Sequence, residues 1–313
     1  MKLAFVFPGQ GSQSVGMLNA LSATYPSVAA TYAEASEVLG VDLWEMVSQG
    51  PEAQLNQTQH TQPAMLAAGV SVWRVWQAQA GPQPIVLAGH SLGEYTALTC
   101  AGAITFADAI QLVADRGRYM QEAVPVGQGG MAAILGLEDQ VVRDVCVQAA
   151  EGEVLEAVNY NSPGQVVVAG TASAVERVVT QAVAAGAKRA LILPVSVPSH
   201  CALMHPAALR MAERLAQIDF HTPRIPVIHN AHVQGESSPE AIRAALVRQI
   251  EAPVRWVETI QKIAADGVHK LVECGPGKVL TGLNKRIDKT TQTLPVFDPE
   301  SLTQALAALG NNV

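Results

Sequence analysis

Ser91 is the residue whose surroundings best suit a nucleophile. Residues 89–93 read Gly-His-Ser-Leu-Gly, a Gly-x-Ser-x-Gly motif with Ser91 at its centre. An apolar run over residues 85–88 predicts a buried strand before the motif, and residues 94–101 predict a helix after it. A strand, this motif and a helix in succession are typical of a nucleophile elbow. We therefore interpret Ser91 as a candidate nucleophile for attack on an acyl carbonyl.

The two glycines of the motif fit this interpretation. A serine on a sharp strand-to-helix turn needs neighbours without side chains, because the backbone packs tightly there. The helix that follows directs its free N–H groups and the positive end of its dipole at the serine. These donors suit the oxyanion that forms when a hydroxyl attacks an acyl carbonyl. The alternative interpretation is a glycine-rich turn with an incidental serine.

A serine nucleophile needs a general base, and the chain contains eight histidines. His90 is a poor candidate because neighbours on a tight elbow point apart. His200 comes after an apolar strand predicted over residues 189–195, at a junction where a cleft between two domains is expected. The alternatives for His200 are a general base and a buried histidine hydrogen-bonded to the backbone.

No carboxylate is an obvious third member of a catalytic triad. The candidate carboxylates occur in helical patterns, where they are expected to face solvent or to pair locally: Asp108, Asp115, Glu138 and Asp144. A carbonyl oxygen is the alternative partner for the imidazole. Such a neutral partner stabilises the imidazolium less, which still suffices for attack on an activated thioester.

The elements around these residues predict an α/β fold with a parallel sheet. Apolar strands alternate with helices along much of the chain, which is typical of such sheets. The strands are predicted over residues 3–7, 85–88, 226–230 and 270–274. The helices are predicted over residues 22–50, 61–80, 105–122 and 240–265, with Thr105 as an N-cap and Asp108 three residues later.

A second unit is predicted inside the first. A Pro/Gly-rich stretch over residues 124–130 marks the candidate boundary. Beyond it the predicted order is strand, helix, strand, strand, helix, strand, which is the ferredoxin-like arrangement βαββαβ. We therefore predict a hydrolase-like large domain formed by residues 1–125 and 199–313. A ferredoxin-like small domain of residues 126–198 is inserted into it.

Composition restricts the class of protein. Apolar residues make up 49% and charged residues 15% of the 313 residues, which predicts a compact globule. The net charge is −7 with no long basic run, so no nucleic-acid partner is expected. No apolar run approaches the roughly 18 residues of a membrane span, and the apolar run at residues 3–7 is too short for a signal peptide. A cytoplasmic protein without a membrane partner is expected.

The cysteines do not suggest a metal site. All four are widely separated in the sequence: Cys100, Cys146, Cys201 and Cys274. No Cys-x-x-Cys pair occurs, so zinc and thioredoxin-like chemistry are poorly supported. Free thiols in a reducing cytosol are expected.

Several further motifs accompany the elbow along the chain. They are Phe-Pro-Gly-Gln-Gly-Ser-Gln at residues 7–13, the elbow through residue 95, Arg116, Asn-Tyr-Asn-Ser-Pro-Gly-Gln at residues 159–165, Val-Pro-Ser-His at residues 197–200 and Glu-Cys-Gly-Pro-Gly at residues 273–277. Together they resemble the malonyl-CoA:acyl carrier protein transacylases of type II fatty acid synthesis. The resemblance covers essentially the whole chain.

The resemblance implies roles for the candidate residues. Ser91 would be the nucleophile and His200 its base. The main-chain carbonyl of Gln249 would orient His200, which fits the missing carboxylate. The main-chain N–H groups of Gln10 and Leu92 would form the oxyanion hole.

The resemblance also implies that Arg116 binds the free carboxylate of the malonyl group. The pattern over residues 112–118 alone does not distinguish Arg116 from Arg118; the resemblance selects Arg116. A guanidinium binds a carboxylate through two parallel hydrogen bonds. An acetyl thioester has no carboxylate and would leave this cation unpaired, which is a strong basis for rejecting it.

The implied activity is that of an acyl-carrier-protein S-malonyltransferase of fatty acid biosynthesis. The malonyl group would pass from malonyl-CoA to Ser91, and then to the phosphopantetheine thiol of acyl carrier protein. The pantetheine arm belongs to the substrates, so no cofactor and no metal is expected. Nothing in the sequence requires more than a monomer.

Three alternatives remain at this point. The first is a hydrolase of the same architecture, although hydrolases of this type place an acid after the serine and the histidine near the C-terminus. The second is a non-catalytic module that binds acyl groups or a carrier protein. The third is a related transferase acting on methylmalonyl or another extender group.

Overall fold

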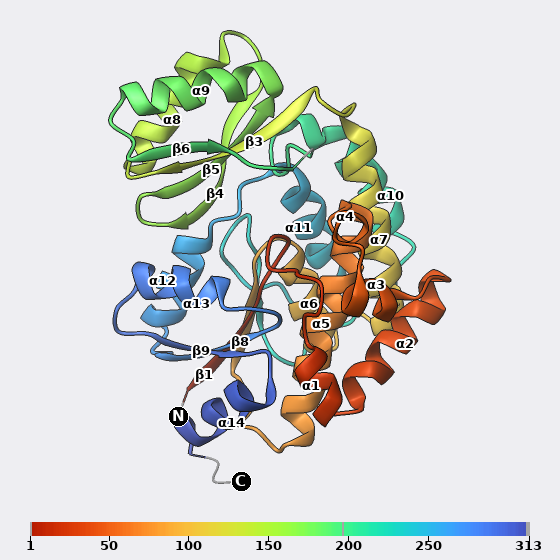
Figure 1. Ribbon diagram of the computed structural model, residues 1–313. Helices are drawn as coiled ribbons and strands as arrows, with labels where there is room; N and C mark the ends of the chain where they lie inside the picture. The colour runs from red at the N-terminus through yellow and green to blue at the C-terminus, as the bar shows by residue number, and fades with distance from the viewer. Residues whose placement is uncertain (1, 196, 311–313) are drawn as a thin grey trace.

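The computed structural model describes residues 2–195 and 197–310, and these residues fold around two separate β-sheets (Figure 1). The larger sheet is parallel, with the strand order β7-β2-β1-β8-β9. Its strands are β1 (Leu3–Phe7), β2 (Val86–Gly89), β7 (Val227–Ile228), β8 (Lys270–Cys274) and β9 (Gln292–Val296). The prediction of an α/β fold with a parallel sheet is confirmed.

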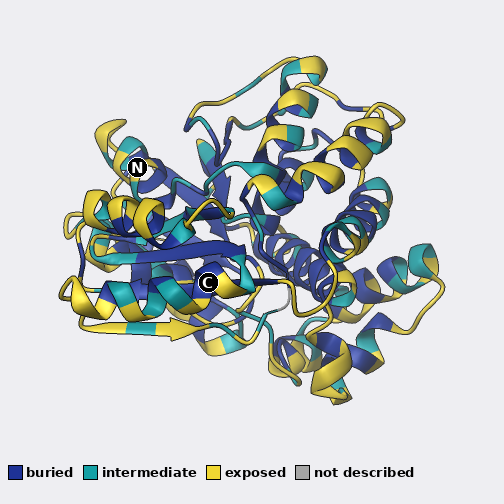
Figure 2. Ribbon diagram, turned by 90° about the horizontal axis from the view of Figure 1, so that it is seen from above, coloured by how far each residue is buried: buried dark blue, intermediate teal, exposed yellow. Residues whose placement is uncertain are grey.

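Strand β1 lies at the centre of this sheet because it is apolar on both faces. Its side chains alternate between two hydrophobic clusters: Phe5 and Phe7 point to one, and Ala4 and Val6 to the other. Such a continuous apolar strand is typical of a parallel sheet covered by helices on both sides. The covering helices are exposed along their outer faces and buried along their inner faces (Figure 2).

Twelve helices belong to this part of the described chain. They are α1 (Asn19–Thr24), α2 (Ser27–Leu39), α3 (Leu43–Gln49), α4 (Glu52–Leu55), α5 (Thr58–Ala78), α6 (Leu92–Cys100), α7 (Phe106–Ala123), α10 (His205–Leu215), α11 (Pro239–Glu251), α12 (Trp256–Ala265), α13 (Val279–Ile287) and α14 (Pro299–Ala308). Helix α7 begins as predicted, because the Thr105 side chain accepts a hydrogen bond from the Asp108 N–H. None of the described helices is long and apolar enough to cross a membrane.

The second sheet is antiparallel, with the strand order β4-β5-β3-β6. Its elements are β3 (Gly129–Leu135), α8 (Asp139–Ala150), β4 (Leu155–Ser162), β5 (Gln165–Thr171), α9 (Ala172–Ala184) and β6 (Arg189–Ile192). Helices α8 and α9 pack together on one face, at the top of Figure 1. On the other face, Met131 and Val167 pack with Cys201, which follows the sheet in the sequence.

The two sheets are joined by a short backbone contact. The Val254 N–H donates to the Val158 carbonyl at 2.8 Å, and the Tyr160 N–H donates to the Val254 carbonyl at 3.0 Å. Strand β4 is thereby tied to the segment that precedes α12.

Two predicted strands are shorter than expected. The strand predicted over residues 189–195 ends at Ile192, because Pro194 has no N–H and the chain turns toward the larger sheet. The strand predicted over residues 226–230 includes only β7, because His229 and Asn230 leave the sheet to bind Glu94. The single helical stretch predicted over residues 22–50 is divided by Gly40, whose φ is 68°.

Candidate active site

Ser91 occupies a sharp turn between β2 and α6. Its φ of 51° and ψ of −108° are uncommon for a residue with a side chain. A Cβ atom on Gly89 would lie 1.9 Å from the Gly93 carbonyl, and one on Gly93 would lie 2.1 Å from the Phe7 carbonyl oxygen. Both glycines of the motif are therefore required by close backbone contacts, and the turn is pressed against the end of β1.

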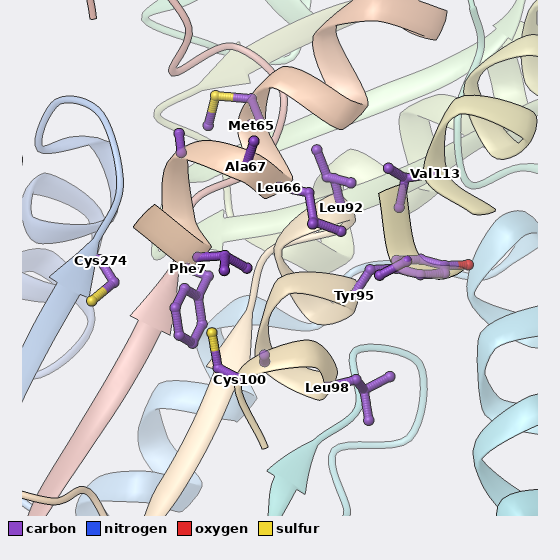
Figure 3. Packing of buried hydrophobic residues seen from close by; sticks show 14 of the residues in the cluster. Phe7, Met65, Leu66, Ala67, Leu92, Tyr95, Leu98, Cys100, Val113 and Cys274 are labelled. Atoms are coloured by element: carbon purple, nitrogen blue, oxygen red, sulfur yellow. The ribbon is translucent and has the colours of Figure 1, made fainter. Parts of the chain in front are cut away.

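Apolar packing fixes the direction of α6 behind this turn. Leu92 lies beside Leu66 of α5, and Tyr95 lies beside Val113 of α7 (Figure 3). All four side chains belong to the main hydrophobic cluster. A well-packed helix limits how far the turn at its N-terminus is able to move.

The structure brings His200 to Ser91, although 109 residues separate them in the chain. Ser91 Oγ lies 2.7 Å from His200 Nε2. His200 Nδ1 lies 2.8 Å from the main-chain carbonyl oxygen of Gln249 in α11. A carbonyl oxygen only accepts hydrogen bonds, so Nδ1 carries the proton and Nε2 is free to accept the Ser91 hydroxyl.

His200 is held in its neutral form. Its side chain is buried, and burial together with the nearby positive charge of Arg116 lowers its pKa from 6.5 to about 3. The hydrogen bond to the Gln249 carbonyl opposes this shift in pKa. A neutral imidazole beside a serine hydroxyl has the protonation state that a general base needs.

Arg116 of α7 places a buried guanidinium against the same hydroxyl. Its Nη1 donates to Gln62 Oε1 at 2.8 Å, and its Nη2 donates to Gln249 Oε1 at 3.0 Å and to Ser91 Oγ at 3.2 Å. Arg116 is only 1% exposed, and its Nε has no hydrogen-bond partner. Within residues 2–195 and 197–310 it forms no direct ion pair, although the charge of Glu94 acts on it electrostatically, so its guanidinium is available to a carboxylate ligand.

Arg118, the alternative from the sequence, lies outside this site. Its side chain is 50% exposed and pairs with Asp115 at 2.8 Å. Asp115 also binds Arg214 at 2.9 Å. His90 is likewise turned away from the serine hydroxyl, because its Nε2 contacts Asn161 Oδ1 at 2.8 Å.

A cavity of about 400 Å³ opens between the two sheets over these residues. Ser91, His200 and Arg116 line it, together with Gln10 in the turn after β1 and Leu92 at the start of α6. Leu92 is the first residue of its helix, where a main-chain N–H has no partner within the helix. Side chains of the antiparallel-sheet part form the opposite wall, among them Met131, Asn159, Leu193, Pro194 and Val195. The described residues contain no group of three or more side chains suited to hold a metal ion.

Comparison with known proteins identifies the family. The model of the acyl transferase domain family matches residues 4–298. A malonyl CoA-acyl carrier protein transacylase from Salmonella typhimurium is 58% identical, with 97% of this chain and 99% of that protein covered. This chain belongs to the malonyl-CoA:acyl carrier protein transacylase family.

Solved structures of the family agree with this fold. A malonyl CoA-acyl carrier protein transacylase from Coxiella burnetii is 50% identical with a TM-score of 0.97, and the match covers 99% of this chain and 98% of that one. A malonyl-transacylase in complex with a type II PKS acyl-carrier protein is 56% identical with a TM-score of 0.97, over 98% of this chain and 100% of that one.

The structure gathers all six predicted site residues around one point, and it adds others that the sequence analysis did not single out. Gln62 and Asn230 bind Arg116 and the Ser91 backbone respectively. The sequence offers a signal for Asn230, because it is the second residue after β7 and lies at the same edge of the parallel sheet as the elbow. For Gln62 the only signal in the sequence is that it is a polar residue in a largely apolar helix.

Proposed function

We propose that this protein transfers the malonyl group of malonyl-CoA to the phosphopantetheine thiol of acyl carrier protein. This is the S-malonyltransferase step of fatty acid biosynthesis, and its intermediate is a malonyl ester of Ser91. The relatives bear the name of this activity. The observation that carries the proposal is the convergence of a serine hydroxyl, a neutral imidazole and an unpaired buried guanidinium within hydrogen-bond distance.

In the first half of the reaction Ser91 Oγ attacks the thioester carbonyl. His200 Nε2 takes the hydroxyl proton as the new C–O bond forms, and the C–S bond then breaks. The proton passes to the departing thiolate, so coenzyme A leaves as a thiol. The main-chain N–H groups of Gln10 and Leu92 are assigned to the oxyanion, because both residues line the cavity beside Ser91.

In the second half the thiol of the carrier's pantetheine arm attacks the malonyl ester. His200 takes the thiol proton and delivers it to Ser91 Oγ as the ester C–O bond breaks. The Gln249 carbonyl keeps the imidazole in one tautomer through both halves. The imidazolium that forms has this neutral carbonyl oxygen as its partner at Nδ1, which suffices in the first half because the thioester under attack is already activated.

Arg116 is assigned to the malonyl carboxylate. The guanidinium already contacts Ser91 Oγ at 3.2 Å, so a carboxylate bound to it lies one short acyl group away from the reacting carbonyl. A paired carboxylate and guanidinium hold the thioester in a single orientation. The same contact distinguishes malonyl from acetyl thioesters.

We also propose the domain organisation predicted from the sequence. Residues 1–125 and 199–313 form a hydrolase-like domain, and residues 126–198 form a ferredoxin-like domain. The element order β3-α8-β4-β5-α9-β6 and the antiparallel strand order support the second assignment. A monomer is proposed as the active form, since the six site residues all come from one chain.

One experiment distinguishes a transferase from a hydrolase. With malonyl-CoA alone, we expect release of about one equivalent of coenzyme A and a lasting malonyl adduct on the protein. With pantetheinylated acyl carrier protein added, release continues and malonyl-carrier accumulates. Carrier protein without the pantetheine arm is the matched control and supports no further release. Continuous release of coenzyme A and free malonate without any carrier would identify a hydrolase.

The depressed pKa of His200 predicts a flat pH profile. The base is active when neutral, so activity is lost only as the pH falls toward its pKa of about 3. We expect kcat/KM for acylation by malonyl-CoA to stay nearly constant between about pH 5 and pH 8. Stopped-flow measurement of coenzyme A release across this range checks the expectation. An acid limb centred near 6.5 would contradict the assignment of a desolvated base.

A further inference from the structure

A buried carboxylate lies directly behind the nucleophile, and the reaction described above does not use it. Glu94 is the third residue of α6, and its side chain is 0% exposed. His229 follows β7 and is 1% exposed, with Nδ1 at 2.7 Å from Glu94 Oε1. A carboxylate so far from water is stable only when hydrogen bonds surround it.

Three donors from two separate parts of the chain supply those hydrogen bonds. His229 Nδ1 reaches Oε1, while the Asn230 N–H and Gln249 Nε2 reach Oε2 at 2.9 Å and 3.0 Å. An ionised carboxylate accepts all three, because it has acceptor sites on both oxygens. An amide in its place has one acceptor oxygen instead of two, so an N–H₂ group would replace one of the oxygens that these groups contact.

One of the donors, Asn230, holds the backbone of the elbow. Asn230 Oδ1 accepts from the Ser91 N–H at 2.7 Å, and Asn230 Nδ2 donates to the Gly89 carbonyl at 2.7 Å. Ser91 has an uncommon backbone conformation, which persists only when its surroundings fix it. Asn230 therefore supports the strained turn through hydrogen bonds to its backbone.

Gln249, whose side chain is the second donor to Oε2, also contacts Ser91, Arg116 and His200. Its Nε2 also donates to the Ser91 carbonyl at 2.9 Å, and its Oε1 accepts from Arg116 Nη2. Its main-chain carbonyl accepts from His200 Nδ1. The bond from Glu94 sets which way the Gln249 amide points, since Nε2 must face the carboxylate and Oε1 the guanidinium.

We propose that Glu94, held by His229, is the positioning residue that fixes the Ser91 backbone through Asn230 and orients Gln249 between Ser91 and Arg116. This inference rests on the proposed function only in that Ser91 is the nucleophile. It goes beyond that function because Glu94 touches neither the acyl group nor the thiol. Its contribution is to hold the Ser91 hydroxyl, the His200 imidazole and the Arg116 guanidinium in their positions relative to one another.

The test compares Glu94→Gln with Glu45→Gln, its matched control. Glu45 has the same place in the first turn of α3 but is exposed. The readout is the second-order rate at which a fluorophosphonate labels Ser91, forming an O–P bond and releasing fluoride. This probe has no carboxylate and needs no carrier, so it reports on positioning even where malonyl is the wrong substrate.

We expect Glu94→Gln to lower the labelling rate about 10- to 100-fold, the usual effect of losing a supporting hydrogen-bond partner. The circular dichroism spectrum remains that of the folded protein, and Glu45→Gln labels at the parental rate. An unchanged labelling rate in folded Glu94→Gln protein would overturn the proposal. Failure of malonyl transfer by the unaltered protein would instead count against the proposed function.

Asn230→Ala provides the second test, because it removes the side chain that binds the Ser91 and Gly89 backbone while keeping the main-chain N–H that donates to Glu94. We expect a comparable loss of labelling in this variant, which also serves if Glu94→Gln does not fold. In the double variant the combined loss is expected to be smaller than the product of the single losses, because both substitutions disturb the branch that runs through Asn230. A double variant whose loss equals the product of the single losses, or a folded Asn230→Ala protein that labels at the parental rate, would overturn the proposal.

Discussion

Arg116→Ala is expected to abolish most of the preference for a malonyl over an acetyl thioester. The guanidinium is buried, and its partners Gln62, Gln249 and Ser91 are all neutral, so the substrate carboxylate is assigned as its counter-charge. Losing one partner of a buried charge pair costs about 2–5 kcal/mol. The ratio of kcat/KM for malonyl-CoA and acetyl-CoA should therefore fall roughly 30- to 5,000-fold.

Arg118→Ala is the control for this prediction. Arg118 lies on the same helix two residues later, carries the same charge and is half exposed. Its removal changes the net charge equally but leaves the cavity intact, so the ratio should remain at its parental value. Arg116→Lys keeps the charge and loses the planar fork, and an intermediate ratio is expected. Equal ratios in the parental and Arg116→Ala proteins would remove Arg116 from the acyl-binding role.

Ser91→Ala is expected to lower malonyl transfer at least about 10⁴-fold, as removal of a covalent nucleophile does. No other hydroxyl is placed at 2.7 Å from His200 Nε2 within the part of the chain described here. The variant should still bind malonyl-CoA, because Arg116 and the cavity remain. Transfer rates with saturating carrier protein and a thermal shift with malonyl-CoA measure the two properties separately.

Mass spectrometry of the intact protein and of its peptides tests which serine carries the malonyl group. The parental protein should gain one malonyl group after brief exposure to malonyl-CoA, and Ser91→Ala should gain none. Ser199 also lines the cavity, so Ser199→Ala is the matched control and should retain the adduct. An adduct that maps to Ser199, or that persists in Ser91→Ala, would refute the assignment of the nucleophile.

The sequence predicted the centre of the fold well because its signals there are local. Strand β1 is a continuous apolar run, and the Gly-x-Ser-x-Gly motif couples β2 to α6 through contacts within a few residues. The ends of elements were less well predicted. Pro194 and the departure of Asn230 from the sheet shorten β6 and β7, and the second effect depends on a partner 136 residues away.

The choice between Arg116 and Arg118 shows where sequence reasoning stops. Both lie in one helix, and only tertiary packing buries the first against Tyr95 and exposes the second. Glu94 is a stronger example. Its place in the first turn of α6 is typical of a solvated helix cap, whereas the structure buries it completely among donors from α11 and from the residues after β7.

Strand β9 and helices α10, α13 and α14 received no prediction. Strand β9 is half exposed and carries Pro295, so it lacks the apolar run that marked β1 and β8. Helix α10 begins at His205 with a proline next, directly after the short turn that follows His200. Their positions depend on packing against elements distant in sequence, which local patterns do not encode.

The close backbone contacts at the elbow determine which parts of the acyl pocket are open to redesign. A side chain added at Gly89 or Gly93 collides with main-chain atoms, so the floor beneath the nucleophile cannot be enlarged or reshaped one residue at a time. The facing wall is built from flexible or branched side chains, such as Met131 and Leu193. Engineering toward bulkier extender units therefore belongs on that wall, where trimming a side chain adds room without disturbing the turn that presents the hydroxyl.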